Sequence, residues 1–196
     1  MANLALNGYS LTLEDLVQAA RNPNSQVTLA PEAIPSIQRA ADAVAKFVSE
    51  GRIAYGITTG FGAFKDRLIP SEDVEKLQEN IILSHAVGTG PELPAEVVRA
   101  MMIIRANTLA KGHSGIRLET LQLMLALLNK NILPLIPSKG SLGASGDLAP
   151  LAHMALPLIG KGEVRFEGEV RNSDEVLREN SLKPIRLGAK EGLALT

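Results

Sequence analysis

Residues 118–128 read Leu-Glu-Thr-Leu-Gln-Leu-Met-Leu-Ala-Leu-Leu, a run in which Glu119 is the only charged side chain. Leucine, methionine, alanine and glutamine are good helix formers, and a helix that is apolar on most sides is buried in the protein interior. The run therefore predicts a central helix that other elements surround.

Signals for further helices stand on both sides of this run. Typical helix starts occur at Thr12, Pro31, Ser71–Asp73 and Pro94. After Thr12 the spacing predicts a buried face made of Leu13, Leu16, Val17 and Ala20. After Pro94 it predicts a helix that runs through Val97, Met101, Ile104, Thr108 and Ala110 and ends at Gly112. A further apolar helix is expected over 148–159, where Pro157 kinks or ends it.

The only convincing strand signal is a small hairpin over 163–170 with Gly168 in its turn. Pro134 and Pro137 are expected to break the chain before the loop that follows. The predicted fold class is therefore mainly α, with one small β-hairpin.

Composition limits the function classes. The 196 residues carry 20 basic and 21 acidic side chains, and aromatic residues make up 3%. No basic block can neutralise a phosphate backbone, so nucleic acid is not expected as a partner. Cysteine is absent and the three histidines are far apart in the sequence, so we expect no metal site. No secretion signal or membrane-spanning run is found, and a cytoplasmic protein with no membrane partner is expected.

Residues 140–147 read Gly-Ser-Leu-Gly-Ala-Ser-Gly-Asp and concentrate small residues before a helix. The loop lacks the Gly-Lys-Ser/Thr of a phosphate-binding loop and the glycine spacing of a dinucleotide-binding turn. It is not a hydrolase nucleophile elbow either, because Asp147 stands where glycine is needed. Taken alone, the loop predicts a tight turn in which Ser145 or Asp147 caps the next helix.

A longer stretch around the loop carries a resemblance. Residues 137–154 read Pro-Ser-Lys-Gly-Ser-Leu-Gly-Ala-Ser-Gly-Asp-Leu-Ala-Pro-Leu-Ala-His-Met. This stretch resembles the signature of the histidine, phenylalanine and tyrosine ammonia-lyase family. Four more segments match in the same order, namely Tyr-Gly-Ile-Thr-Thr-Gly-Phe-Gly at 55–62, Ser-His-Ala-Val-Gly-Thr-Gly at 84–90, Ser-Gly-Ile-Arg at 114–117 and Lys-Glu-Gly-Leu-Ala-Leu at 190–195. The resemblance implies the amino-terminal part of a fumarase/aspartase-like helical-bundle lyase fold.

The resemblance also implies an internal electrophile. Members of the family close an Ala-Ser-Gly triplet into a 4-methylidene-imidazol-5-one ring (MIO), which here corresponds to Ala144, Ser145 and Gly146. The Gly146 amide nitrogen attacks the Ala144 carbonyl carbon, and Ser145 then loses its hydroxyl as water. Glycine suits the attacking position because it has no Cβ. Asp147 has a supporting role in ring formation, and no external cofactor is expected.

Two further residues take roles from the resemblance. Tyr55 corresponds to the general base that removes the β-proton of an amino acid substrate. Because the reference pKa of tyrosine is about 10, that role requires a site that lowers it. His85 corresponds to the residue that contacts the substrate imidazole in histidine-type members. Ser84-His85 and the 143–154 stretch are most like the histidine type, whereas Thr58 stands where many such members carry asparagine. His113 and His153 are expected to be structural.

The resemblance further implies that 1–196 form the MIO-bearing amino-terminal domain of a longer chain. The family's conserved asparagine would follow Thr196 directly, and the carboxyl-terminal bundle would be absent from this chain. Family active sites are built from several subunits of a homotetramer, so we expect the isolated chain to have little or no activity. The expected reaction is elimination of ammonia from L-histidine to give urocanate.

Alternatives remain open at the level of sequence. Within the family they are a phenylalanine or tyrosine ammonia-lyase and a 2,3-aminomutase. Outside it, Ser145, His153 and Asp147 suggest a serine hydrolase, although their close spacing makes a triad hard to assemble. A non-catalytic fragment or assembly module is the last alternative.

Overall fold

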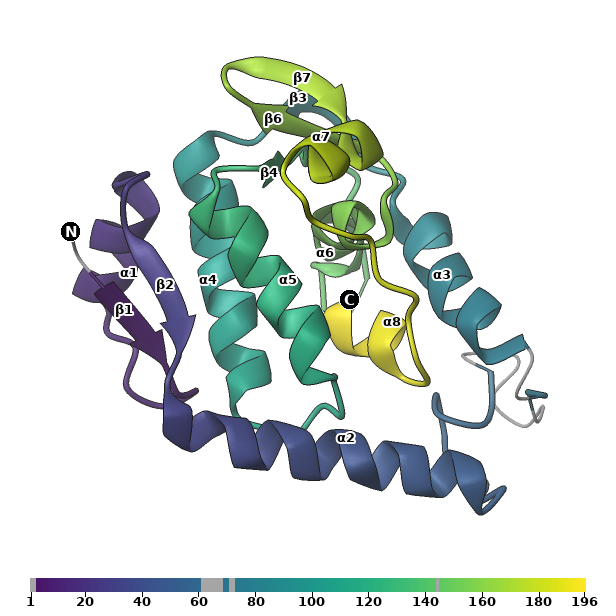
Figure 1. The fold of residues 1–196 in the computed structure, drawn as a ribbon. Coiled ribbons are helices and arrows are strands. Elements are labelled where there is room, and N and C mark those ends of the chain that lie inside the picture. Colours follow the sequence, from purple (N-terminus) through teal and green to yellow (C-terminus); the bar gives the residue numbers. More distant parts are fainter. Residues whose placement is uncertain (1–2, 61–68, 71–72, 144) are drawn as a thin grey trace.

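The computed structural model describes residues 3–60, 69–70, 73–143 and 145–196. Within these residues helices dominate, which confirms the predicted class (Figure 1). The helices are α1 (Leu13–Arg21), α2 (Ile34–Ser49), α3 (Val74–His85), α4 (Ala95–Ala110), α5 (Leu118–Asn129), α6 (Leu148–Ala155), α7 (Ser173–Glu179) and α8 (Glu191–Leu195). The strands are β1 (Asn3–Leu6), β2 (Gln26–Leu29), β3 (Thr89–Glu92), β4 (Leu133–Pro134), β5 (Pro137–Lys139), β6 (Glu163–Phe166) and β7 (Glu169–Asn172).

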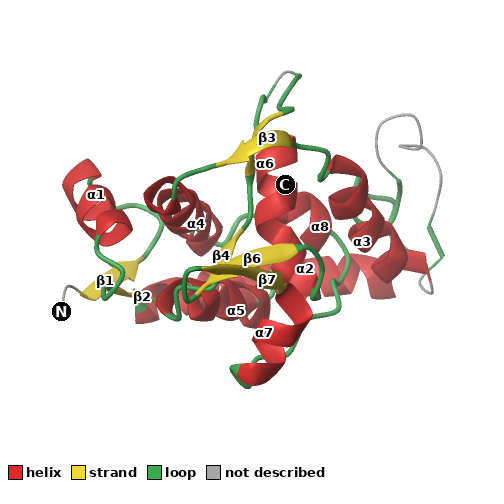
Figure 2. Ribbon diagram, turned by 90° about the horizontal axis from the view of Figure 1, so that it is seen from above, coloured by secondary structure: helices red, strands yellow, loops and turns green. Residues whose placement is uncertain are grey.

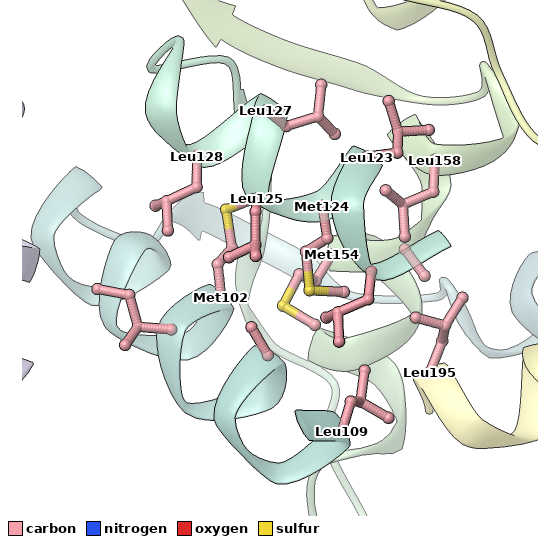
Figure 3. Close-up of a cluster of buried hydrophobic side chains, with 14 of the residues drawn as sticks. Met102, Leu109, Leu123, Met124, Leu125, Leu127, Leu128, Met154, Leu158 and Leu195 are labelled. Carbon is pink, nitrogen blue, oxygen red and sulfur yellow. The ribbon is translucent and has the colours of Figure 1, made fainter. Parts of the chain in front are cut away.

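The core forms around α5, as the leucine-rich run predicts. Most of its side chains are buried, and they pack between α4 on one side and the α6 region on the other (Figures 1 and 3). Three methionines, Met102, Met124 and Met154, lie close together at the centre of the cluster in Figure 3. Methionine is flexible enough to fill the irregular gaps between helices that cross at different angles. Leu195 extends the same cluster, so α8 is part of the core.

The helix predicted after Pro94 is confirmed as α4, which starts directly after Pro94 and ends at Ala110, two residues before Gly112. The structure buries Val98, Met102 and Leu109 of α4 against the core, while Val97 and Ile104 are 37% and 48% exposed. Apolar residues stand on both sides of this helix, so periodicity alone does not select the face that packs against α5. Tertiary packing makes that choice.

The face predicted for α1 is only partly correct. Thr12 caps this helix through a hydrogen bond from the Asp15 amide, as predicted. However, Leu13 is 70% exposed, and the fully buried residues of the helix are Ala19 and Ala20. α1 packs closely on α4, and small residues at the contact allow that close approach.

The described residues contain further strand pairs besides the single hairpin that the sequence predicts. That hairpin is confirmed as β6–β7, with Gly168 at φ +86° in its turn. β4 pairs with β6, β1 pairs with β2 in parallel, and β3 pairs with β5. Pro134 and Pro137 lie within these short strands and do not simply break the chain. Strands of two to four residues have no alternation long enough to detect in sequence.

A fully buried arginine joins two helix ends. Arg99 of α4 is 3% exposed, and its guanidinium lies at the carboxyl-terminal ends of α1 and α5. Its donors reach five oxygens, namely the carbonyls of Ala19, Ala20, Asn22 and Leu128 and the side-chain oxygen of Asn131. A cation at helix carboxyl ends is favourable because the last carbonyls have no partner within the helix. Burial lowers the pKa of Arg99 from its ordinary value.

Candidate functional site

Two segments singled out by sequence meet through a pair of short strands. α3 ends at His85, and β3 begins at Thr89 a few residues later. β3 pairs antiparallel with β5, with Thr89 opposite Lys139, and β5 leads directly into the 140–147 loop. In Figure 2 the loop extends from the β3–β5 pair beside α6. The chain therefore places the His85 segment next to the loop that contains Ser145.

The loop before α6 uses glycine at its turning points. Gly143 and Gly146 have φ values of +115° and +73°, and a Cβ at either position would meet open space. Glycine is needed there for the backbone conformation and not for close packing. The Ser141 hydroxyl donates to the Gly146 carbonyl, so the loop closes on itself across the Ala-Ser-Gly triplet.

The triplet itself is only partly described. Ala144 lies outside the described residues, and Ser145 and Gly146 are exposed. Asp147 occupies the position before α6, but its carboxylate makes no capping hydrogen bond. The capping role that the loop alone predicted for Asp147 is therefore wrong, because its backbone (φ −124°, ψ −1°) departs from the extended geometry of a usual cap.

A half-buried cation lies near Asp147. The Arg105 guanidinium donates through Nη2 to the Ala194 carbonyl at 2.8 Å, which ties α4 to α8. Its Nε is buried and has no hydrogen-bond partner in the described part of the chain. Burial lowers the pKa of Arg105, and the nearby negative charge of Asp147 raises it. The Asp147 carboxylate thus lies within the electrostatic field of an internal arginine.

The position of α8 is fixed by a buried carboxylate. Glu191 is 1% exposed and accepts hydrogen bonds from Arg117, Thr120 and the Gly188 amide. Its contact with Arg117 is an ion pair of 2.6 Å, and Glu191 is the strongest charged partner that raises the pKa of Arg117 against the lowering effect of burial. Gln78 of α3 accepts from the Gly192 amide, so α8 is held against both α3 and α5.

His85 presents one ring nitrogen for further bonding. Its Nδ1 lies 2.7 Å from the Ile81 carbonyl, which can only accept a hydrogen bond. Nδ1 therefore carries the proton in the neutral ring, and Nε2 is left as an acceptor. Ser84 also lies 3.1 Å from Nδ1 and reinforces this orientation. A half-buried histidine with this tautomer can receive an N–H group from a ligand.

The Tyr55 segment folds as a compact turn. The Thr58 hydroxyl accepts from the Ala54 amide at 2.9 Å and donates to the Arg52 carbonyl at 2.6 Å, and Thr58 is 8% exposed. Thr58 is thus a structural residue of the turn. Tyr55 is 59% exposed, and residues 61–62 of the same motif lie outside the described residues.

The structure does not bring all predicted site residues together. Residues 51–60 lie beside the amino-terminal end of α3, whereas α3 ends at His85 (Figure 1). The twelve residues of α3 span about 18 Å at 1.5 Å per residue. The β3–β5 pair connects the segment after His85 to the 140–147 loop, whereas the Tyr55 turn lies at the opposite end of α3 from His85.

Outside the serine hydrolase alternative, the sequence assigns His153 only a structural role and no specific contact. Its Nε2 accepts a hydrogen bond of 2.9 Å from the Gly88 amide, which follows the His85 segment. Burial lowers the pKa of His153 below its ordinary value of 6.5, which favours the neutral ring that this bond requires. The sequence feature that could have indicated this contact is that His153 is the single titratable side chain on the apolar helix α6.

We expect this bond to make stability depend on pH. Because the folded chain holds His153 with a lowered pKa, the unfolded chain binds its proton more readily. The neutral His153 ring contributes to the free energy of unfolding fully above about pH 6.5. This contribution is lost as the pH falls through the lowered pKa of His153 in the folded chain. When the pH is lowered across this range, the urea concentration at the midpoint of unfolding should fall less steeply for His153→Leu than for the parent. Equal slopes for the two proteins would contradict the assignment, and exposed His113→Leu serves as control.

The described residues contain neither a cluster of metal-binding side chains nor a helix suited to cross a membrane. No group of three or more histidine, aspartate or glutamate side chains able to hold a metal ion occurs there. No helix in the same part of the chain is both long enough and apolar enough to cross a membrane.

Comparisons with known proteins agree on one family. The model of the family described as aromatic amino acid lyase matches residues 11–196. Histidine ammonia-lyase from Chloroflexus aurantiacus is 57% identical over 193 residues, which cover 97% of this chain and 37% of that protein. The crystal structure of histidine ammonia-lyase from Trypanosoma cruzi superposes with a TM-score of 0.90 at 39% identity, over 98% of this chain and 37% of that one.

A third relative acts on a different substrate. Ergothionase from Treponema denticola, an ergothioneine-degrading enzyme, superposes with a TM-score of 0.93 at 36% identity, over 99% of this chain and 39% of that one. In each of these comparisons the chain spans a little over one third of the relative's length. The matches cover nearly the whole of this chain.

Proposed function

Because the chain belongs to the aromatic amino acid lyase family, we propose that it forms the electrophile-bearing part of a histidine ammonia-lyase. The proposed reaction is elimination of ammonia from L-histidine to give urocanate. The observation that carries the substrate assignment is the geometry of His85, whose Nδ1 donates to the Ile81 carbonyl, so that Nε2 can accept the imidazole N–H of a histidine substrate. The identity of 57% to a histidine ammonia-lyase supports the same choice.

The loop fits the proposed MIO group. Ring closure forms a bond between the Gly146 nitrogen and the Ala144 carbonyl carbon and releases one water, and loss of the Ser145 hydroxyl releases a second. Left-handed glycines on both sides of Ala144 and Ser145 permit a tightly bent backbone that other residues would strain. Open space around Gly143 and Gly146 leaves room for the rearrangement. The exposed position of Ser145 makes it accessible to a substrate amine.

The remaining residues have proposed roles around this group. The ring supplies an electrophilic methylene that turns the substrate amine into a better leaving group. Tyr55 removes the β-proton as general base, and His85 orients the imidazole. Asp147, next to the triplet and in the field of Arg105, supports ring formation. Tyr55 is 59% exposed in this chain, and the rest of the gene product or other subunits would have to bring it and the substrate together.

The proposal extends to the complete gene product. Residues 1–196 would form its amino-terminal MIO-bearing domain, and a carboxyl-terminal helical bundle in a cytoplasmic homotetramer would complete the active site. Since the chain spans only about 37% of the curated relative's length, we expect the isolated chain to have little or no lyase activity. Urocanate formation measured for the complete gene product and for this chain alone tests this proposal. We expect it with the complete gene product and not with this chain alone. Cinnamate or coumarate formed in place of urocanate would assign the phenylalanine or tyrosine alternative.

We expect His85→Leu in the complete gene product to raise the KM for L-histidine about tenfold to a hundredfold. Leucine cannot accept the imidazole N–H, and an unpaired polar group of the substrate would then be buried. The measurement is steady-state urocanate production over a range of L-histidine concentrations. His113→Leu is the matched control, because His113 is exposed and lies outside the site. An unchanged KM for His85→Leu would remove this residue from substrate binding.

A further inference from the structure

The surroundings of Gly88 join three segments at one point. A Cβ placed on Gly88 would lie 3.0 Å from His153 Nε2 and 3.2 Å from the Lys139 carbonyl oxygen. A Cβ placed on Gly140 would lie 3.0 Å from the Gly88 Cα. The backbone after His85, the end of β5 and the side chain of His153 are thus closely packed, and a larger residue at position 88 would require its neighbours to shift.

His153 provides the one side-chain hydrogen bond described at this junction. Its Nε2 accepts from the Gly88 amide at 2.9 Å across a sequence separation of 65 residues. The next residue, Thr89, begins the β3–β5 pairing, whose partner strand continues into the Ser145 loop. The Gly88 contact therefore lies between the residue proposed to bind substrate and the residues proposed to form the electrophile.

The backbone on either side of this bond is well anchored. α6 buries Leu151, Ala152 and Met154 around His153, so the imidazole projects from a rigid helix. On the other side, the Val87 amide bonds to the His85 carbonyl at 2.9 Å, which links Gly88 to His85 through a tight turn. A shift of Gly88 would consequently be transmitted to His85.

We propose that His153 is a positioning residue that sets the distance between the substrate-binding His85 segment and the Ala144–Gly146 triplet, by holding the Gly88 amide on α6. This inference rests on the proposed function, because it concerns the alignment of the substrate with the electrophile. Burial lowers the pKa of His153 and so favours the neutral acceptor form. His153 itself has no part in the chemistry: it acts through Gly88 and His85.

The test uses His153→Leu, His153→Gln and the control His113→Leu in the complete gene product. Leucine retains apolar volume and removes the acceptor, whereas the glutamine side-chain oxygen can reach about where Nε2 lies. We expect His153→Leu to raise the KM for L-histidine about tenfold and to lower kcat about tenfold as well, because a Gly88 amide without its acceptor lets His85 and the bound substrate shift relative to the triplet. His153→Gln should restore most of the affinity, and His113→Leu should match the parent.

Two further readouts separate positioning from simple stabilisation. The mass of the peptide spanning 140–147 should show loss of two waters in the parent and in all variants. Deuterium exchange should become faster at 85–90 in His153→Leu and should stay unchanged in α5. An unchanged KM in His153→Leu, or a failure of glutamine to restore it, would overturn the inference. Loss of the cyclised peptide together with activity would overturn it too, because His153 would then serve folding alone.

Failure of the proposed function has a different signature. A parent protein that shows no water loss at 140–147 and no ammonia release refutes the lyase proposal. In that case, comparing the deuterium exchange rate of residues 85–90 in His153→Leu with that in the parent still decides whether His153 holds this segment. An unchanged rate would overturn the positioning role.

Discussion

Ser145→Ala in the complete gene product is expected to lower the rate of urocanate formation by more than about a thousandfold, the scale of loss when the group that forms a covalent intermediate is removed. Alanine has no hydroxyl to lose, so no exocyclic methylene can form from this residue. The substitution is small and falls on an exposed loop position, so folding should be unaffected. The measurement combines steady-state kinetics with the mass of the 140–147 peptide.

A matched control for this result is Ser141→Ala. Ser141 belongs to the same loop and donates to the Gly146 carbonyl, but it lies outside the triplet. We expect this variant to retain the loss of two waters, although ring closure can be slower because one restraint on the loop is gone. A Ser145→Ala protein that deaminated L-histidine as fast as its parent would disprove the proposed function.

Local signals in the sequence predicted much of the fold. Thr12 caps α1 because its side chain and the Asp15 amide are three residues apart, and Gly168 turns the hairpin because its φ is +86°. α6 ends at Ala155, two residues before Pro157, as a proline in a helix requires. Each of these features is determined within one turn of the chain.

Features set by distant contacts could not be predicted. Arg99 looks like an ordinary helix residue until α1 and α5 bring their carboxyl ends to it. Glu191 belongs to a recognisable motif, but its burial against Arg117 follows from packing between elements far apart in the sequence. The same holds for the candidate site, where the bond between His153 and Gly88 joins residues that are 65 positions apart in the sequence.

Arg99→Met should have the largest effect on stability, lowering the free energy of unfolding of the chain by about 3–5 kcal/mol. Methionine approximates the aliphatic part of arginine but donates no hydrogen bond. The variant would leave the buried carbonyls of Ala19, Ala20 and Leu128 without the donors that Arg99 now supplies. Each orphaned buried acceptor costs about 1–3 kcal/mol, and partial access of water reduces the sum. Urea denaturation followed by circular dichroism measures the change.

Arg21→Met provides the contrast that makes this prediction specific. Arg21 forms an ion pair of 3.0 Å with Glu96, but the two side chains are 68% and 51% exposed. Such surface pairs contribute only about 0–1 kcal/mol, so we expect Arg21→Met to shift the urea midpoint little. Both arginines lie at the contact between α1 and α4 and carry the same charge, and they differ in burial. Equal losses of stability for the two variants would contradict this prediction. They would mean that the carbonyls near Arg99 find other hydrogen-bond partners, and that the Arg99 guanidinium does not join α1 to α5.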